Sequence, residues 1–290
     1  IYYAKNAWYI RTTAVRDRMV ELNSTINWVP ETIRSGRFGN WLEHNVDWAL
    51  SRERFWGTPL PVWTDGEGDY VCIGSVKELE TLCGRSLAAL DLHRPAIDEV
   101  HFTHPDNGRE YRRVPEVIDC WFDSGAMSYA QWHYPFENQQ EFEQHFPADY
   151  ICEAIDQTRG WFYTMHVLAT ALFDRPAFEN VICHGILLAE DGGKLSKKLR
   201  NYTEPALIFE QQGADALRWY LMSSNIVRGG NLRMSDAGIT DVVRQVLIPI
   251  WDAYSFFTLY ANVDRYRAEM RTDSTRLLDR YLLGKTRTLI

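Results

Sequence analysis

The chain has 290 residues, of which 46% are apolar and 24% charged, and 31 Lys and Arg against 39 Asp and Glu give a formal net charge of −8. This composition is typical of a globular protein and excludes a disordered chain; at roughly 150 residues per domain, the length suggests about two domains. Every apolar stretch is much shorter than the ~20 residues that span a bilayer, so a membrane-spanning protein is excluded. The acidic balance argues against a surface that coats nucleic acid throughout, but it permits a local basic patch that meets RNA or phosphates.

Five cysteines are scattered along the chain without a CxxC pair, and no basic segment precedes an apolar core at the N-terminus. This cysteine usage fits a reducing cytoplasm best. The chain opens on Ile-Tyr-Tyr-Ala, which has strand character and lacks an initiator Met. We therefore expect the N-terminal part of a longer protein to be missing.

The first residues predict a strand at 7–10, a helix opened by Thr12 or Thr13, and a polar turn before residue 28. The stretch 38–63 is rich in Trp and Arg and ends in two prolines. Because proline prevents a regular helix, this stretch is interpreted as a packed loop.

A small inserted subdomain is predicted over 64–115. Two turns rich in Gly, Asp and Asn, at 65–69 and 104–108, bracket short strands and a helix near 76–82. The strands are expected at 70–73, 100–103 and 111–114.

An alternating pattern of strands and helices returns after the insertion. Apolar residues at 150–152 predict a strand, and apolar positions from 161 to 172 at spacings of 1, 3 and 4 predict a helix. Residues 181–188 form an apolar run typical of a buried strand. This order defines an α/β fold, in which ligands bind beyond the carboxyl ends of the strands. From residue 205 onward the pattern predicts only helices.

The first of two polar clusters lies where the strand at 150–152 passes into its helix. Glu153 and Asp156 are carboxylates at a helix start, where they could hold an ammonium group or ribose hydroxyls. The alternative is that Asp156 is an ordinary N-cap and Glu153 a solvated loop residue.

The second cluster follows a Gly turn at 191–193 and contains Lys194, Ser196, Lys197 and Lys198. Such a loop could clamp a polyphosphate whose negative charge grows as a bond to phosphorus breaks. The alternative is a solvated charged face, which is the more common meaning of a charge run.

The two clusters in this order resemble the class I aminoacyl-tRNA synthetases. Residues 194–198, Lys-Leu-Ser-Lys-Lys, are similar to the KMSKS signature of that class, with Leu in place of Met and Lys in the last position. The resemblance runs from Trp8 to about Asp264. Three segments look like the isoleucyl branch, and the last two together are specific: Ser-Arg-Glu-Arg-Phe-Trp-Gly-Thr-Pro at 51–59, Trp-Phe-Asp-Ser-Gly at 121–125 and Asp-Gln-Thr-Arg-Gly-Trp-Phe at 156–162.

The resemblance implies the second half of a class I Rossmann-type nucleotide-binding domain with a small α+β insertion, followed by an α-helical module. The implied segments are a return strand and helix at 1–63, the insertion at 64–115, the second Rossmann half with the lysine loop at 116–203, a helical stem-contact region at 204–234 and the start of a helical anticodon-binding domain at 235–290.

The resemblance also implies isoleucine–tRNA ligase activity, in which L-isoleucine and ATP with Mg²⁺ form isoleucyl-adenylate before transfer to tRNA(Ile). Glu153, Asp156 and Gln157 match residues that line the adenylate site. Trp121 and Trp161 match the two aromatic walls of the isoleucine pocket. An apolar pocket of this kind separates Ile from Val by only ~1–3 kcal/mol, so a second, hydrolytic check is expected.

In the lysine loop, Lys197 matches the lysine that holds the ATP phosphates, and Lys194 and Ser196 are expected to complete the catalytic set. Leu195 and Lys198 fill the other motif positions, and a following Asn201 is expected to order the loop. Attack of the isoleucine carboxylate on the α-phosphate needs positioning and electrostatics more than proton abstraction. No catalytic base is therefore expected.

The sequence departs from the family in several places. The HIGH motif of the class and the large editing insertion do not occur in it, so the isolated chain is expected to be inactive and to need the N-terminal half of the same protein as a partner. Ala154 stands where a glycine is usual and could crowd the adenylate. Many relatives carry Cys pairs in both turns of the insertion, whereas Cys72, Cys83, His101 and His104 lack tetrahedral ligand spacing here, so no zinc is expected.

Two other functions compete with this interpretation. A valyl or leucyl relative is disfavoured by the segment at 156–162. A non-catalytic tRNA-binding paralogue would keep the lysine loop and the helical module, but it would gain nothing from the two tryptophans, Glu153 and Lys197. In each case the protein is expected in the cytoplasm, without a membrane partner.

Overall fold

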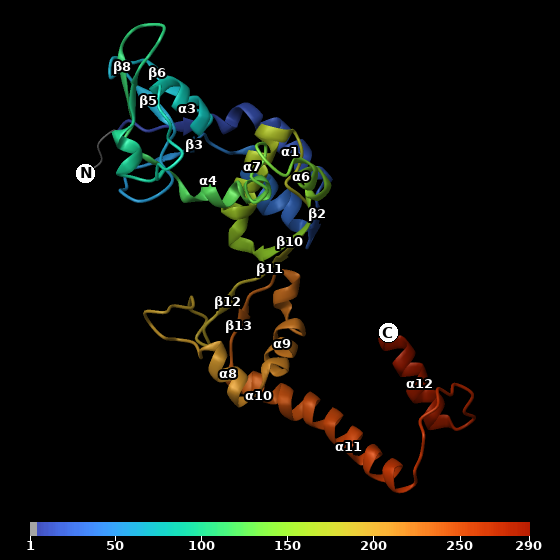
Figure 1. The fold of residues 1–290 in the computed structure, drawn as a ribbon. Helices are drawn as coiled ribbons and strands as arrows, with labels where there is room; N and C mark the ends of the chain where they lie inside the picture. The colour runs from blue at the N-terminus through green and yellow to red at the C-terminus, as the bar shows by residue number, and fades with distance from the viewer. Residues whose placement is uncertain (1–4) are drawn as a thin grey trace. The chain divides into compact units, whose positions relative to one another are not determined.

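The computed structural model describes residues 5–290, and the chain divides into two compact units (Figure 1). The first unit runs to Leu187 and also includes Asn225–Leu232, and the second comprises Leu188–Ser224 and Arg233–Ile290. The first unit mixes helices with sheets and the second is mainly helical, which confirms the predicted fold class.

A three-stranded parallel sheet lies at the centre of the first unit. Its strand order is β10 (Ala148–Ala154), β11 (Phe178–His184) and β2 (Asn27–Val29). The first two strands were predicted, whereas β2 falls where a polar turn was expected; three residues are too few to show an alternating pattern. The apolar core beside this sheet includes the fully buried side chains of Met19, Trp28, Phe38, Phe162 and Phe178.

Helix α7 (Trp161–Phe173) confirms the helix predicted from the 161–172 spacing. It is buried continuously from Phe162 to Thr170, and it packs against α1 (Arg16–Thr25). His166 lies at the centre of α7 with no exposed surface, and its Nε2 donates a hydrogen bond of 2.8 Å to the carbonyl oxygen of Met19. Its Nδ1 has no hydrogen-bond partner within residues 5–290.

The insertion forms a four-stranded antiparallel sheet with its own apolar core. The strand order is β6-β5-β8-β7, and α3 (Val76–Cys83) packs near β7. The predicted helix and the three predicted strands are confirmed, and a further strand joins them at Val62–Thr64. The strands are β5 (Val62–Thr64), β6 (Tyr70–Cys72), β7 (His101–Thr103) and β8 (Glu110–Arg113).

An ion pair joins the two turns of the insertion. The guanidinium of Arg109 donates to a carboxylate oxygen of Asp65 at 2.6 Å, and the Asp65 side chain is only 1% exposed. The hydrogen bond from Arg109, followed by bonds from the backbone N–H groups of Glu67 and Asp69, keeps the pKa of Asp65 below its usual value, although burial opposes this. Asp69 also accepts a hydrogen bond of 2.5 Å from the Tyr111 hydroxyl. A carboxylate that is already paired with a guanidinium is a poor zinc ligand. Asp65, in a turn where many relatives carry a Cys pair, is therefore not suited to bind zinc.

Short elements connect the central sheet to the insertion. The stretch 38–63, predicted as a loop, contains helix α2 and two-residue strands, because its prolines fall only at its end. The elements of the first unit not yet given are β1 (Tyr9–Ile10), α2 (Gly39–Glu43), β3 (Trp48–Ala49), β4 (Ser51–Arg52), β9 (Val117–Ile118), α4 (Cys120–Gly125), α5 (Met127–Ala130) and α6 (Gln139–His145).

The second unit begins with the lysine loop and continues with helices. Its small apolar core contains Ile208, Ala216 and Ile239, one from each of the first three helices. These are α8 (Pro205–Gln211), α9 (Ala214–Met222) and α10 (Asp236–Val242). The prediction of helices alone was wrong at β13 (Leu232–Arg233), which is paired with β12 (Leu187–Leu188) where the chain passes between the units.

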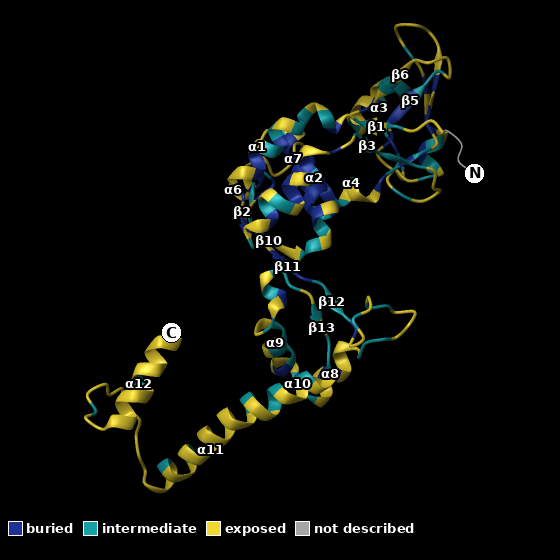
Figure 2. Cartoon of the chain, turned by 180° about the vertical axis from the view of Figure 1, so that it is seen from behind, coloured by how far each residue is buried: buried dark blue, intermediate teal, exposed yellow. Residues whose placement is uncertain are grey.

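One long helical stretch follows α10. A π-helical turn at Val243–Leu247 leads into α11 (Ile248–Val263), and α12 (Leu277–Leu289) comes last. The π-helical turn lies just before Pro249, because a proline has no N–H to donate to the preceding turn. Neither α11 nor α12 contains a buried residue (Figure 2). Across residues 5–290, no helix combines the length and apolar character that crossing a membrane requires.

Candidate active site

Glu153 lies at the carboxyl end of β10, where the sequence predicted a polar cluster. In the parallel pairing of β10 with β11, Glu153 is opposite Cys183 and Ala154 is opposite His184. Both strands therefore end at the same edge of the sheet, which is the edge where α/β proteins bind ligands. His184 was not predicted as a site residue; its position at the end of a buried strand was the available signal.

The backbone at Ala154 has φ −75° and ψ 161°, an extended conformation that any residue adopts. Its methyl group therefore causes no backbone strain. Burial raises the pKa of the neighbouring Cys183 to about 11, and burial followed by the charge of Glu153 raises that of Cys152. Both thiols stay protonated at neutral pH, so neither provides a thiolate nucleophile at this edge.

A tight turn, Ile155–Arg159, connects β10 to α7 and holds the second carboxylate. Its centre is fixed by the fully buried Thr158, whose hydroxyl donates to the Ile155 carbonyl at 2.7 Å and accepts from Nε of Arg37 at 2.9 Å. Asp156 is exposed beside it.

Gln157 caps the first turn of α7. Its side-chain oxygen accepts a hydrogen bond of 2.9 Å from the backbone N–H of Trp161, and its amide nitrogen donates to Asp156 at 3.3 Å. The alternative in which Asp156 serves as the N-cap is therefore wrong, because Gln157 accepts the N–H at the start of α7. Asp156 accepts the bond from Gln157 through one of its two carboxylate oxygens.

Helix α4 contains one of the predicted pocket tryptophans and accepts a hydrogen bond from the other. Trp121 lies on its first turn, 41% exposed, and its ring is so close to Gly160 that a Cβ added there would be 3.1 Å from a ring carbon. The indole N–H of Trp161 donates to the Ser124 carbonyl at 3.0 Å. At the end of α4, Gly125 lies directly on α7, where an added Cβ would be 2.9 Å from Thr164. The Trp-Phe-Asp-Ser-Gly and Asp-Gln-Thr-Arg-Gly-Trp segments are thus in direct contact.

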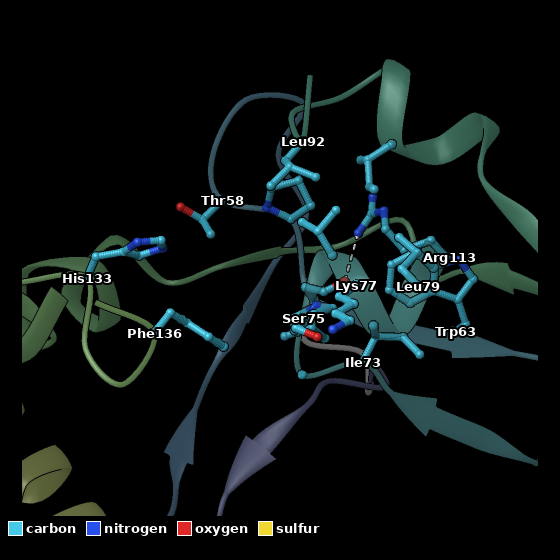
Figure 3. A pocket seen from close by; sticks show the side chains of 16 residues that line it. Thr58, Trp63, Ile73, Ser75, Lys77, Leu79, Leu92, Arg113, His133 and Phe136 are labelled. Carbon is cyan, nitrogen blue, oxygen red and sulfur yellow. Dashed lines mark hydrogen bonds between the residues drawn. The ribbon is translucent and has the colours of Figure 1, made fainter. Parts of the chain in front are cut away.

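A cavity of about 600 Å³ lies elsewhere in the first unit (Figure 3). His133 and Phe136 lie on one side of it, and Ser75, Lys77 and Leu79 lie on the other. None of the predicted site residues lines this cavity. Its lining is mainly apolar, and its polar members are Thr58, Ser75, Lys77, Arg113 and His133.

The lysine loop belongs to the second unit. Lys194, Lys197 and Lys198 are exposed, and Leu195 and Ser196 are partly buried. Asn201 accepts a hydrogen bond of 2.9 Å from the backbone N–H of Ser196 and donates one of 3.0 Å to the Lys194 carbonyl. Asn201 therefore bonds to the backbone of the lysine motif both as acceptor and as donor, which supports its expected role in ordering the loop.

Within the loop, the Ser196 hydroxyl accepts from the backbone N–H of Leu199 at 3.3 Å. Ser196 thus stabilises the turn that follows it. Within residues 5–290, no three His, Cys, Asp or Glu side chains are grouped in a way that could hold a metal ion.

Comparison with known proteins identifies the family. Residues 1–233 match the model of tRNA synthetases class I (I, L, M and V), so the chain belongs to this class of enzymes. It is 52% identical over 300 residues to the isoleucine–tRNA ligase of Leifsonia xyli and 53% identical over 296 residues to that of Mycobacterium tuberculosis H37Rv. Each match covers the whole chain, and the chain spans 27% and 28% of the length of these two relatives.

The fold is also that of the class. The structure of Mycobacterium tuberculosis methionyl-tRNA synthetase in complex with methionyl-adenylate matches with a TM-score of 0.62 and 17% identity, over 94% of this chain and 45% of that one. At this identity the match shows the shared fold alone.

Proposed function

We propose that the chain supplies the amino-acid pocket and the lysine loop of an isoleucine–tRNA ligase. The observation that carries this proposal is the contact of α4 with α7, which places Trp121 against Gly160 and bonds Trp161 to Ser124. The identity of 50–54% to isoleucine–tRNA ligases along the chain supports isoleucine over valine or leucine as the substrate.

Two indole rings suit a branched aliphatic side chain, because such a group forms no hydrogen bonds and is recognised only by shape and apolar contact. Trp121 and Trp161 would form the two walls. Glu153, Asp156 and Gln157, at the end of β10 and in the turn after it, would bind the polar parts of the adenylate.

In the activation step, a carboxylate oxygen of isoleucine would form a bond to the α-phosphorus of ATP while the bond to pyrophosphate breaks. Negative charge then develops on the departing pyrophosphate, and Lys197 would stabilise it, with Lys194 and Ser196 as further donors. Mg²⁺ would accompany the ATP phosphates and neutralise part of their charge. The isoleucyl group would then pass to tRNA(Ile), and the enzyme would work in the cytoplasm, where tRNA is charged.

The pocket can be tested by calorimetric titration of the chain with isoleucyl-sulfamoyl-adenosine and its valyl counterpart. We expect the isoleucyl compound to bind more tightly, and Trp121→Ala and Trp161→Ala each to weaken binding at least about tenfold. Trp251→Ala, which removes an exposed tryptophan of the second unit, is the control and should bind as the parent does. If the parent binds neither compound even within the complete gene product, a pocket formed by these residues is contradicted.

The role of Lys197 requires the complete gene product and a pyrophosphate-exchange assay. Lys197→Ala should lower the exchange rate about 10²–10³-fold with near-normal isoleucine binding, because the lysine acts on charge that develops only in the transition state. Equal exchange by the variant and the parent would exclude this role, whereas a complete parent protein that catalyses no exchange would favour a non-catalytic tRNA-binding paralogue.

A further inference from the structure

Asp119 holds the first turn of α4, on which Trp121 lies. Its side chain is only 5% exposed. One carboxylate oxygen accepts a hydrogen bond of 3.2 Å from the backbone N–H of Trp121. The other accepts two hydrogen bonds, one of 3.1 Å from the indole N–H of Trp48 and one of 2.6 Å from the guanidinium of Arg52. The helix start is therefore fixed through a single buried carboxylate.

Arg52 is the charged partner of this carboxylate, and it is itself held in place. A second guanidinium nitrogen donates to the carbonyl oxygens of Ala49 and Ser51 at 2.7 and 3.0 Å. Its strand β4 pairs with β9, which leads directly into α4. Removing the guanidinium would leave a nearly buried carboxylate without its counter-ion, and such a group moves toward solvent or rearranges its neighbours.

The other end of α4 is fixed independently of Arg52. The Ser124 carbonyl accepts the indole N–H of Trp161, and Gly125 lies on the backbone of Thr164 in α7. A shift of the first turn of α4 therefore moves Trp121 while Trp161 and the end of α4 stay in place.

We propose that Arg52 and Asp119 are positioning residues that set the separation of Trp121 from Trp161 and thereby the preference for isoleucine over valine. The proposal rests on the proposed function, in which these rings form the walls of the amino-acid pocket. Isoleucine and valine differ by one methylene group, for which an apolar pocket provides roughly 10- to 200-fold discrimination. A small displacement of one wall removes part of this factor, whereas contacts to the adenosine remain.

The test compares Arg52→Ala, Arg52→Lys and Asp119→Asn with the parent chain. The matched control is Arg18→Ala, because Arg18 forms an ion pair of the same 2.6 Å length with Asp174, and its side chain is 38% exposed, as is that of Arg52. The first measurement is the ¹⁹F spectrum of chain labelled with 5-fluorotryptophan, in which Trp121→Phe assigns the Trp121 resonance. The second is the ratio of affinities for isoleucyl- and valyl-sulfamoyl-adenosine.

We expect Arg52→Ala and Asp119→Asn to shift the Trp121 resonance and to lower the affinity ratio at least about threefold, with Arg52→Lys closer to the parent. Arg18→Ala should change neither quantity. An unchanged Trp121 resonance in Arg52→Ala would overturn the proposal, as would an unchanged ratio or an equal effect of Arg18→Ala. If the parent binds neither compound even within the complete gene product, the proposed pocket is contradicted, whereas the ¹⁹F spectrum still decides whether Arg52 positions Trp121.

Discussion

Replacement of His166 by Gln tests whether a buried neutral histidine makes the first unit sensitive to acid. The imidazole is fully buried in α7; burial lowers its pKa from 6.5 to about 4, although the hydrogen bond to the Met19 carbonyl acts in the opposite direction. Protonation would create a second buried N–H donor at Nδ1, which has no partner in the described part of the chain. The surroundings are apolar, since the rings of Phe38 and Phe178 lie 5.7 and 6.5 Å away.

The sign follows from proton uptake on unfolding. Because the folded pKa is below the unfolded one, the unfolded state binds more protons, and stability falls as the pH drops below 6.5 and levels off below about 4. With these two values, linkage gives a loss of about 2 kcal/mol between pH 7.5 and pH 5 from this residue. Glutamine retains an N–H donor for the Met19 carbonyl and does not titrate.

The assay is urea unfolding at pH 7.5 and pH 5, monitored by near-ultraviolet circular dichroism. The parent should lose about 2 kcal/mol more stability between the two pH values than His166→Gln does. His44→Gln, which replaces an exposed histidine of the same unit, should behave as the parent. Equal losses in the parent and in His166→Gln would refute the reasoning.

Three further outcomes are expected. Gly160→Ala should weaken binding of isoleucyl-sulfamoyl-adenosine about tenfold or more in calorimetry, because its Cβ would lie 2.7 Å from the side-chain oxygen of Gln157; unchanged affinity would show that the turn adjusts freely. Asp65→Asn should lower the Tm of the first unit by a few degrees, while EDTA leaves the parent's Tm unchanged; a fall in Tm with EDTA would indicate a metal in the insertion. Asn201→Ala should speed tryptic cleavage after Lys197 and Lys198 several-fold at an unchanged Tm, and an equal cleavage rate would exclude loop ordering by Asn201.

The long elements were predictable from the sequence because each has a local pattern. The apolar spacing of α7 and the apolar runs of β10 and β11 are present within single segments of the chain, and so is the position of Glu153 at a strand end. The two-residue strands β3 and β4 have no such pattern, since pairing with distant partners determines them.

Parts of the candidate site were not predictable because they depend on contacts between distant residues. Arg52 and Asp119 are 67 positions apart, and no local pattern indicates their ion pair. The cap of α7 shows the same limit on a smaller scale. Asp156 and Gln157 are both compatible with a helix start, and only the three-dimensional turn determines that Gln157 bonds to Trp161.

The path of the chain between the units has a consequence for experiments with fragments. The chain leaves the first unit at Leu187, returns for Asn225–Leu232 and leaves again, and on its return the Ile226 carbonyl accepts a hydrogen bond of 2.9 Å from Gly185. A fragment that stops at residue 203, the end of the second Rossmann half expected from the sequence, would lack this returning segment and leave the end of β11 unprotected. Expression boundaries for the first unit therefore belong after residue 232, and a protease cut in the lysine loop would leave two fragments that remain associated through the folded unit.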